Sequence, residues 1–94
     1  MKRVRFEYES PDASSVFLAG DFTDWEEHAR AMRRAKGGGA FVAIVPLAPG
    51  EYQYKFIVDG EWVEDPHAEA VTNRLGTRNS RLTVGVAERG RKAA

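Results

Sequence analysis

Alternation of apolar and polar residues is the dominant pattern of this chain, and it predicts β-strands. The clearest example lies at residues 51–65, where two alternating runs flank an Asp59-Gly60 dipeptide. An Asp-Gly pair in this setting is typical of a two-residue hairpin turn, because both central residues then need a positive φ. The predicted cross-strand partners are Val58 and Glu61, Ile57 and Trp62, Phe56 and Val63, and Lys55 and Glu64.

This register divides the hairpin into two faces, since successive side chains of a strand point to opposite sides. One face carries Tyr52, Tyr54, Phe56 and Val63, and we expect it to face the core. The other face carries Gln53, Lys55, Ile57, Trp62 and Glu64. Lysine and glutamine rarely point into a core, so we expect this second face to be exposed. A tryptophan beside a lysine on an exposed face is a candidate contact surface for a ligand.

Further short strands are predicted on both sides of the hairpin. They are expected at residues 2–9, 15–20, 40–46 and 81–86, with turns at 10–14 and 47–50. Residues 68–77 show no clean period and are expected to form an irregular loop that bends at Gly76. Residues 26–36 consist of good helix formers. Residues 29–35 could instead pair back across the three glycines at 37–39, and in a chain of strands we favour this hairpin.

About seven short strands joined by turns predict an all-β fold, an antiparallel β-sandwich of the immunoglobulin-like type. The 94 residues are enough for one domain that is stable without disulfides or metals. We assign residues 1–87 to this module. Residues 88–94 are small and charged, and we expect them to form a disordered tail.

Composition excludes several classes of function. The chain has no cysteine, and its 14 basic residues balance 14 acidic ones, which argues against nucleic acid as a partner. The absence of a long apolar run or a secretory leader predicts a soluble, cytoplasmic domain without membrane contact. His28 and His67 lack metal-ligand spacing, so we expect no metal and no cofactor. The basic cluster Arg33, Arg34 and Lys36 is interpreted as a solvated hairpin end, with contact to a phosphate as the alternative.

The two tryptophans, Trp25 and Trp62, suggest a sugar ligand. A pyranose ring has one face of C–H bonds that can pack on an indole while its hydroxyls form hydrogen bonds. Covering about 100 Å² of apolar surface per ring is worth about 2.5 kcal/mol before entropic costs. Two such platforms support weak binding, of the order of micromolar to millimolar, which suits an attachment module.

Carboxylates raise the alternative of a glycosidase, which flanks the scissile bond with two acidic residues. The candidates are Asp21, Asp24, Asp59, Glu61, Glu64 and Asp65. The aspartates stand beside residues typical of turns and caps, such as Gly60, Pro66 and Thr23. A domain of this size also has little room for a deep cleft that excludes water. We therefore predict that the protein is not an enzyme and has no catalytic residues.

Three blocks of the sequence resemble a known family. They are residues 16–25 (VFLAGDFTDW), residues 51–62 (EYQYKFIVDGEW) followed by Asp65-Pro66, and residues 75–80 (LGTRNS). In this order they are similar to the glycogen-binding domain of carbohydrate-binding module family 48. This early-set domain is found in the β subunit of AMP-activated protein kinase and, more distantly, in isoamylases and glycogen branching enzymes. The resemblance covers residues 3–86.

The resemblance implies binding of an α-1,4-glucan such as glycogen, starch or a maltooligosaccharide. It makes Trp25 and Trp62 stacking platforms and Lys55 a donor to hydroxyls. It adds Leu75, which would reach past or through the glucan ring, and the polar contacts Thr77 and Asn79. Two departures from the family pattern, Thr23-Asp24 in the tryptophan loop and Ser80 after Asn79, remove no stacking residue.

We expect a module that stands alone, without a catalytic barrel or a kinase-assembly region, and that tethers or senses polysaccharide for a glucan-metabolising partner. A protein-interaction domain with little glucan affinity is the alternative, since such domains often pack against a catalytic neighbour. An enzyme of glucan metabolism is the third hypothesis, and replacing Asp24 or Asp65 by asparagine would test it.

Overall fold

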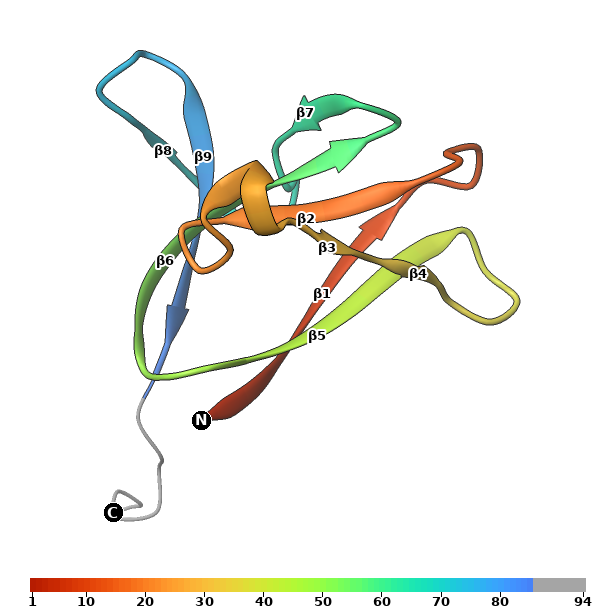
Figure 1. Ribbon diagram of the computed structural model, residues 1–94, viewed down its shortest axis with the longest axis horizontal. Helices are drawn as coiled ribbons and strands as arrows, with labels where there is room; N and C mark the ends of the chain where they lie inside the picture. The colour runs from red at the N-terminus through yellow and green to blue at the C-terminus, as the bar shows by residue number, and fades with distance from the viewer. Residues whose placement is uncertain (86–94) are drawn as a thin grey trace.

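Two antiparallel sheets pack face to face in the computed structural model, which describes residues 1–85 (Figure 1). Sheet A has the strand order β1-β5-β4, and sheet B has the order β3-β2-β6-β9-β8 with β7 also paired to β6. The elements are β1 Lys2–Glu9, β2 Val16–Gly20, the 3-10 helix η1 Trp25–His28, β3 Arg30–Ala31, β4 Arg33–Arg34, β5 Ala40–Leu47, β6 Gly50–Val58, β7 Glu61–Val63, β8 Glu69–Thr72 and β9 Arg78–Val84. The predicted all-β antiparallel sandwich is confirmed.

The β6–β7 hairpin has the predicted turn and register. Asp59 and Gly60 adopt φ angles of 48° and 88°, as a two-residue turn with two left-handed positions requires. Val58, Ile57 and Phe56 pair with Glu61, Trp62 and Val63. The fourth predicted pair, Lys55 and Glu64, lies beyond the paired part, because β7 ends at Val63. The carboxylate of Asp59 accepts hydrogen bonds from the backbone N–H groups of Ser14 and Ser15, both at 2.9 Å, and so fixes the turn to the loop before β2.

The core lies between the sheets and is built from the inward residues of the alternating strands. Phe56 and Leu18 have no exposed surface, and Phe6, Tyr54 and Phe41 are almost fully buried. The Phe6 and Tyr54 rings meet edge to face, with their centroids 5.0 Å apart. Aromatic pairs of this geometry add to the stabilisation that burial gives. The hairpin face predicted to point inward therefore does so.

The segment 29–35 forms β-strands, as the sequence analysis favoured. It forms two short strands, however, and these belong to different sheets. β3 pairs with β2 in sheet B, whereas β4 pairs with β5 in sheet A across the glycines. Met32 lies between them, is buried, and donates its backbone N–H to the Val16 carbonyl at 2.9 Å. Burial of this one side chain between the layers explains the change of sheet. The prediction of a single hairpin strand is wrong in this respect, and residues 1–85 contain nine strands where about seven were expected.

The prediction of an irregular loop over residues 68–77 is wrong at its start. β8 pairs along β9, with Val71 opposite Asn79, and β9 begins at Arg78 rather than at residue 81. β8 is a short edge strand with mostly exposed side chains, so it has no apolar alternation for the sequence to display. The predicted bend at Gly76 is confirmed by its φ of 88°. Residue 86 of the predicted last strand and the tail at 88–94 lie outside the described residues.

Among residues 1–85, no helix has the length and the apolar character needed to cross a membrane.

Candidate functional site

The outer face of sheet B carries a shallow groove that brings together all six site residues predicted from the sequence. They are Trp25, Lys55, Trp62, Leu75, Thr77 and Asn79, and the groove is also lined by Asp21, Gln53 and Asn73. The lining residues come from β6, from β7, from the loop after β2 and from the β8–β9 segment, which gather at one end of the molecule in Figure 1. The central strand β6 explains this convergence, because β2 pairs on one of its edges while β7 and β9 share the other.

Trp62 is the exposed aromatic platform of the groove. It sits on the short strand β7, opposite Ile57, and 42% of its surface is accessible. Lys55 is two residues from Ile57 on the same outward face of β6 and is half-buried. The hairpin turn therefore places an indole and an ammonium group side by side, as the alternation predicted.

Trp25 is held by a tight loop whose centre is Thr23. The Thr23 side chain is buried, and its Oγ1 accepts a hydrogen bond from the Gly20 N–H at 2.9 Å and lies 2.8 Å from the Trp25 carbonyl, to which it can donate. Asp24 and Trp25 both have left-handed backbones, with φ angles of 55° and 56°. Such conformations are costly for bulky residues and persist where surrounding bonds enforce them, often at functional sites. Thr23 supplies these bonds, so the departure from the family pattern keeps the loop capped.

Leu75 projects from the tip of the β8–β9 segment and is 87% exposed. Asn73 holds this tip in place. Its Oδ1 accepts hydrogen bonds from the backbone N–H groups of Leu75 and Thr77 at 2.9 and 3.1 Å, and its Nδ2 donates to Thr77 Oγ1 at 2.8 Å. The tip is therefore a preorganised turn that presents an apolar side chain to solvent at the edge of the groove.

The polar part of the groove consists of Asn79, Gln53 and Asp21. Asn79 is 94% buried, because only 6% of its surface is accessible, and its Nδ2 donates to Gln53 Oε1 at 3.0 Å. This bond directs the Gln53 amide so that its NH₂ group remains the end able to donate to a ligand. Asp21 accepts a hydrogen bond from the Gln53 backbone N–H at 3.2 Å. Burial raises the pKa of the Asp21 carboxyl above its usual value, and the hydrogen bond from Gln53 opposes that shift.

Two of the other candidate carboxylates, Asp65 and Glu64, are engaged in structure. Asp65 accepts from the Tyr54 hydroxyl at 2.6 Å and from the His67 N–H at 2.9 Å, and Glu64 pairs with Arg78 at 3.0 Å. Of the six acidic candidates, Asp21 alone lines the groove. Within the described range, no group of three or more His, Cys, Asp or Glu side chains is arranged to hold a metal ion. The groove is suited to binding by stacking and hydrogen bonding.

Three residues of the groove were missed by the sequence analysis as site residues. Gln53 could have been found, because the hairpin alternation already placed it on the outward face with Lys55. Asn73 and Asp21 carried no such signal, since their position depends on how the β8–β9 tip and the loop after β2 pack beside β6. Together, the fold and the groove define a β-sandwich binding module that presents aromatic side chains on an open sheet face.

Comparison with known proteins agrees with this class. Residues 2–89 match the family described as the glycogen recognition site of AMP-activated protein kinase. The match spans nearly the whole chain, and the chain belongs to this family.

Curated relatives are subunits of that kinase. The mouse 5'-AMP-activated protein kinase subunit beta-2 is 43% identical over 75 residues, which are 80% of this chain and 27% of the subunit. The pig subunit beta-1 is 42% identical over 69 residues, covering 73% of this chain and 53% of the relative. The chain thus spans about a quarter of the mouse subunit and about half of the pig sequence.

Among solved structures, the fold is similar to part of a maltogenic amylase from S. marinus. The TM-score is 0.70 at 24% sequence identity, and the superposition covers 93% of this chain and 14% of the amylase. This likeness shows the fold, and it agrees with the β-sandwich expected from the sequence.

Proposed function

We propose that this protein is a non-catalytic module that binds α-1,4-glucans, such as glycogen, starch or maltooligosaccharides, in the groove of sheet B. The observation that carries the proposal is the convergence of Trp25, Trp62 and Leu75 with hydrogen-bonding side chains around one open groove. A helical glucan chain presents apolar sugar faces and a rim of hydroxyls, and this groove offers a partner for both.

The two indoles serve as stacking platforms, and the Leu75 tip contacts the ring edge or the interior of the glucan turn. Lys55 and Thr77 meet hydroxyls directly. Asn79 has a different role from the one that the resemblance implies. Because it is nearly fully buried, it acts through its hydrogen bond to Gln53, and the Gln53 amide makes the contact.

The open shape of the groove suits a polymer, which can enter and leave along its length without a lid. Stacking on two indoles supports affinities of the order of micromolar to millimolar for a single chain end. Such affinity suits tethering, in which many chain ends of one glycogen particle compete for the same module. A glucan-metabolising enzyme is the partner that this activity would serve.

Titration calorimetry tests the proposal with maltoheptaose as the ligand and cellohexaose as the control for linkage. We expect saturable heat with the α-1,4-linked sugar and none with the β-1,4-linked one, and retention of the protein on immobilised glycogen. A folded protein that gives no heat with maltoheptaose and passes through a glycogen column unretarded would refute the proposal.

A further inference from the structure

The outer face of sheet A, together with the edge strand β3 of sheet B, forms a second concave surface away from the groove. Eleven residues line it, and six of them are basic while none is acidic. The basic residues are Arg3, Arg5, Arg30, Arg33, Arg34 and Lys36. We call this surface the basic concavity. In a chain with a formal net charge of zero, it is a marked separation of charge.

The strand register gives the basic concavity an apolar centre. Along β5, Val42, Ile44 and Pro46 alternate with buried or inward residues and point outward, and Ile44 is 43% exposed. β1 pairs on one side of β5 and β4 pairs on the other. The apolar line of β5 therefore runs down the middle of the sheet.

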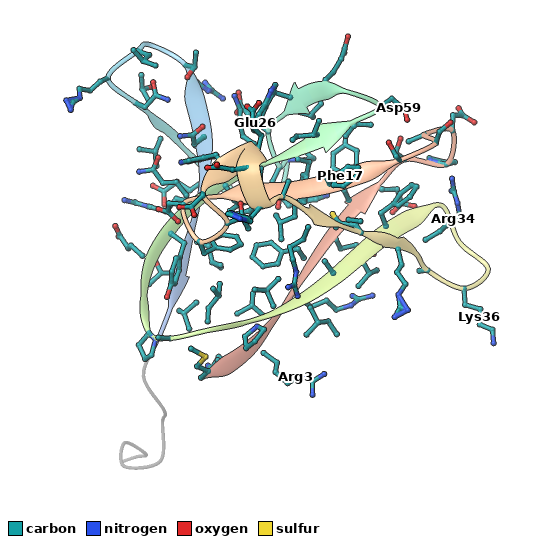
Figure 2. All side chains as sticks on the ribbon, viewed as in Figure 1. Arg3, Phe17, Glu26, Arg34, Lys36 and Asp59 are labelled. Carbon is teal, nitrogen blue, oxygen red and sulfur yellow. The ribbon has the colours of Figure 1, made fainter. Side chains whose placement is uncertain are left out.

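Arginines flank this apolar line on both sides. On β1, Arg5 lies opposite Ile44 and Arg3 lies opposite Pro46. On β4, Arg33 lies opposite Val42. The two flanking strands are separated by two strand spacings, or about 10 Å. Figure 2 shows Arg3 projecting from the edge strand and Lys36 from the β4–β5 turn.

Most of this charge is not neutralised within the described residues. Arg34 has a structural role, because it donates to the Ala13 carbonyl at 2.6 Å and stacks over the Phe41 ring at 4.5 Å. Arg5 pairs with Glu7 at 2.8 Å. In residues 1–85, Arg3, Arg33 and Lys36 have no carboxylate within ion-pair distance. Cations of like sign gathered on one face repel one another unless an anionic partner is present.

We propose that the basic concavity docks an acidic amphipathic helix of a partner protein. An α-helix is about 10–12 Å wide with its side chains, which is close to the spacing between the flanking strands β1 and β4. Its apolar stripe would lie on Ile44 and Val42, and glutamates on both sides of the stripe would form charge-assisted hydrogen bonds with the guanidinium groups.

Other anionic partners fit the basic concavity less well. Single-stranded nucleic acid is held by stacking on aromatic residues, and none lines this surface. An anionic membrane needs a protruding apolar surface, whereas Ile44 lines a concave one. A free phosphate would leave the apolar centre without a role.

This proposal stands independently of glucan binding, because the basic concavity and the groove share no lining residue. A helix on sheet A and a glucan on sheet B could be held at the same time. The module would then link a polysaccharide on one side to a protein on the other.

The test uses fluorescence anisotropy with a synthetic helical peptide that has leucines along one face and glutamates on both flanks, titrated with the full chain. We expect Arg33→Glu to weaken binding by about tenfold or more, and Ile44→Ser by about fivefold. Arg74→Glu, which makes the same charge change in the exposed β8–β9 tip, should stay within about twofold of the wild type. A saturating amount of maltoheptaose should leave the peptide affinity unchanged.

Three outcomes would overturn the proposal. The first is that the wild type fails to bind the acidic peptide at low salt while remaining folded by circular dichroism. The second is that Arg33→Glu and Arg74→Glu lose equal affinity, which indicates attraction by net charge alone. The third is that polyphosphate or vesicles with anionic headgroups compete fully and Ile44→Ser has no effect, which indicates a site for anions without an apolar contact.

Discussion

Replacement of Trp62 by alanine is the perturbation that tests the groove most directly. A tryptophan side chain presents up to about 250 Å² of surface. With 42% of Trp62 accessible, about 100 Å² is available to a stacked sugar, worth about 2.5 kcal/mol at 25 cal/mol per Å². Since 1.4 kcal/mol corresponds to a factor of ten, we expect the maltoheptaose affinity to fall by about sixtyfold.

Phe17→Ala is the matched control for this variant. Phe17 lies on β2 opposite Ile57, and Ile57 lies opposite Trp62, so the two aromatic residues share the outward face of sheet B. Phe17 is 37% exposed, close to the value for Trp62, but it does not line the groove. Its removal should change the maltoheptaose affinity by less than about twofold, because an apolar contact acts only where the ligand covers it.

Titration calorimetry measures the maltoheptaose affinity of the wild type and both variants, and circular dichroism confirms that the variants are folded. Binding by a folded Trp62→Ala variant that equals that of the wild type would refute the placement of the sugar on this indole. An equal loss in both variants would show that the whole outer face of sheet B, and not the groove, determines affinity.

Three further predictions concern the loop before η1, the β8–β9 tip and the core. Gly20→Ala should lower the free energy of unfolding by about 1–3 kcal/mol in urea titrations, because its Cβ would lie 2.6 Å from the Phe22 ring. Asn73→Ala should weaken maltoheptaose binding by about two- to tenfold in calorimetry, because a freed Leu75 must be ordered on binding. Burial, and then a hydrogen bond, raise the pKa of the Tyr54 phenol far above its usual 10.0. As the pH rises above 10, the phenol loses its proton in the unfolded chain before it does so in the folded one. The free energy of unfolding measured by urea titration should therefore fall above pH 10, and it should fall less in Tyr54→Phe.

Each of these predictions has its own control. Gly38→Ala should be harmless, since its Cβ would have no neighbour closer than 3.8 Å, and equal losses at Gly20 and Gly38 would contradict the steric argument. The double variant Asn73→Ala with Leu75→Ala should bind maltoheptaose almost as well as Leu75→Ala alone. If the losses of binding free energy in the two single variants add up fully, Asn73 does not act through Leu75. If the free energies of unfolding of the wild type and Tyr54→Phe change in parallel between pH 8 and 11, the Tyr54 phenol is not the cause of the loss of stability.

Part of the candidate site could be predicted from the sequence because its geometry is local. The hairpin turn at Asp59-Gly60 sets the register within a few residues, and the register alone places Trp62 beside Lys55 on the outward face. The resemblance to a family added Leu75, Thr77 and Asn79, and the structure places all three around the same groove. Their roles in binding remain predictions.

The rest could not be predicted, since it depends on contacts between distant segments. Residues 69–72 show no strand pattern of their own and become β8 only by pairing with β9. The change of sheet between β3 and β4 follows from the burial of Met32 between the layers. Asn79 is predicted as a polar contact from the resemblance alone, and only the fold shows that it is buried and donates to Gln53.

Which residues alternate, where the hairpin turns and which of its faces points inward follow from the local sequence, because backbone sterics and side-chain alternation act over a few residues. Which strands share an edge of β6, and which arginines gather beside β5, depends on contacts between distant segments. Arg3 and Arg33 are 30 positions apart in the chain, and the pairing of β1 and β4 with the same strand β5 brings them to one surface. Such pairings are set by the burial of the whole core, to which every strand contributes.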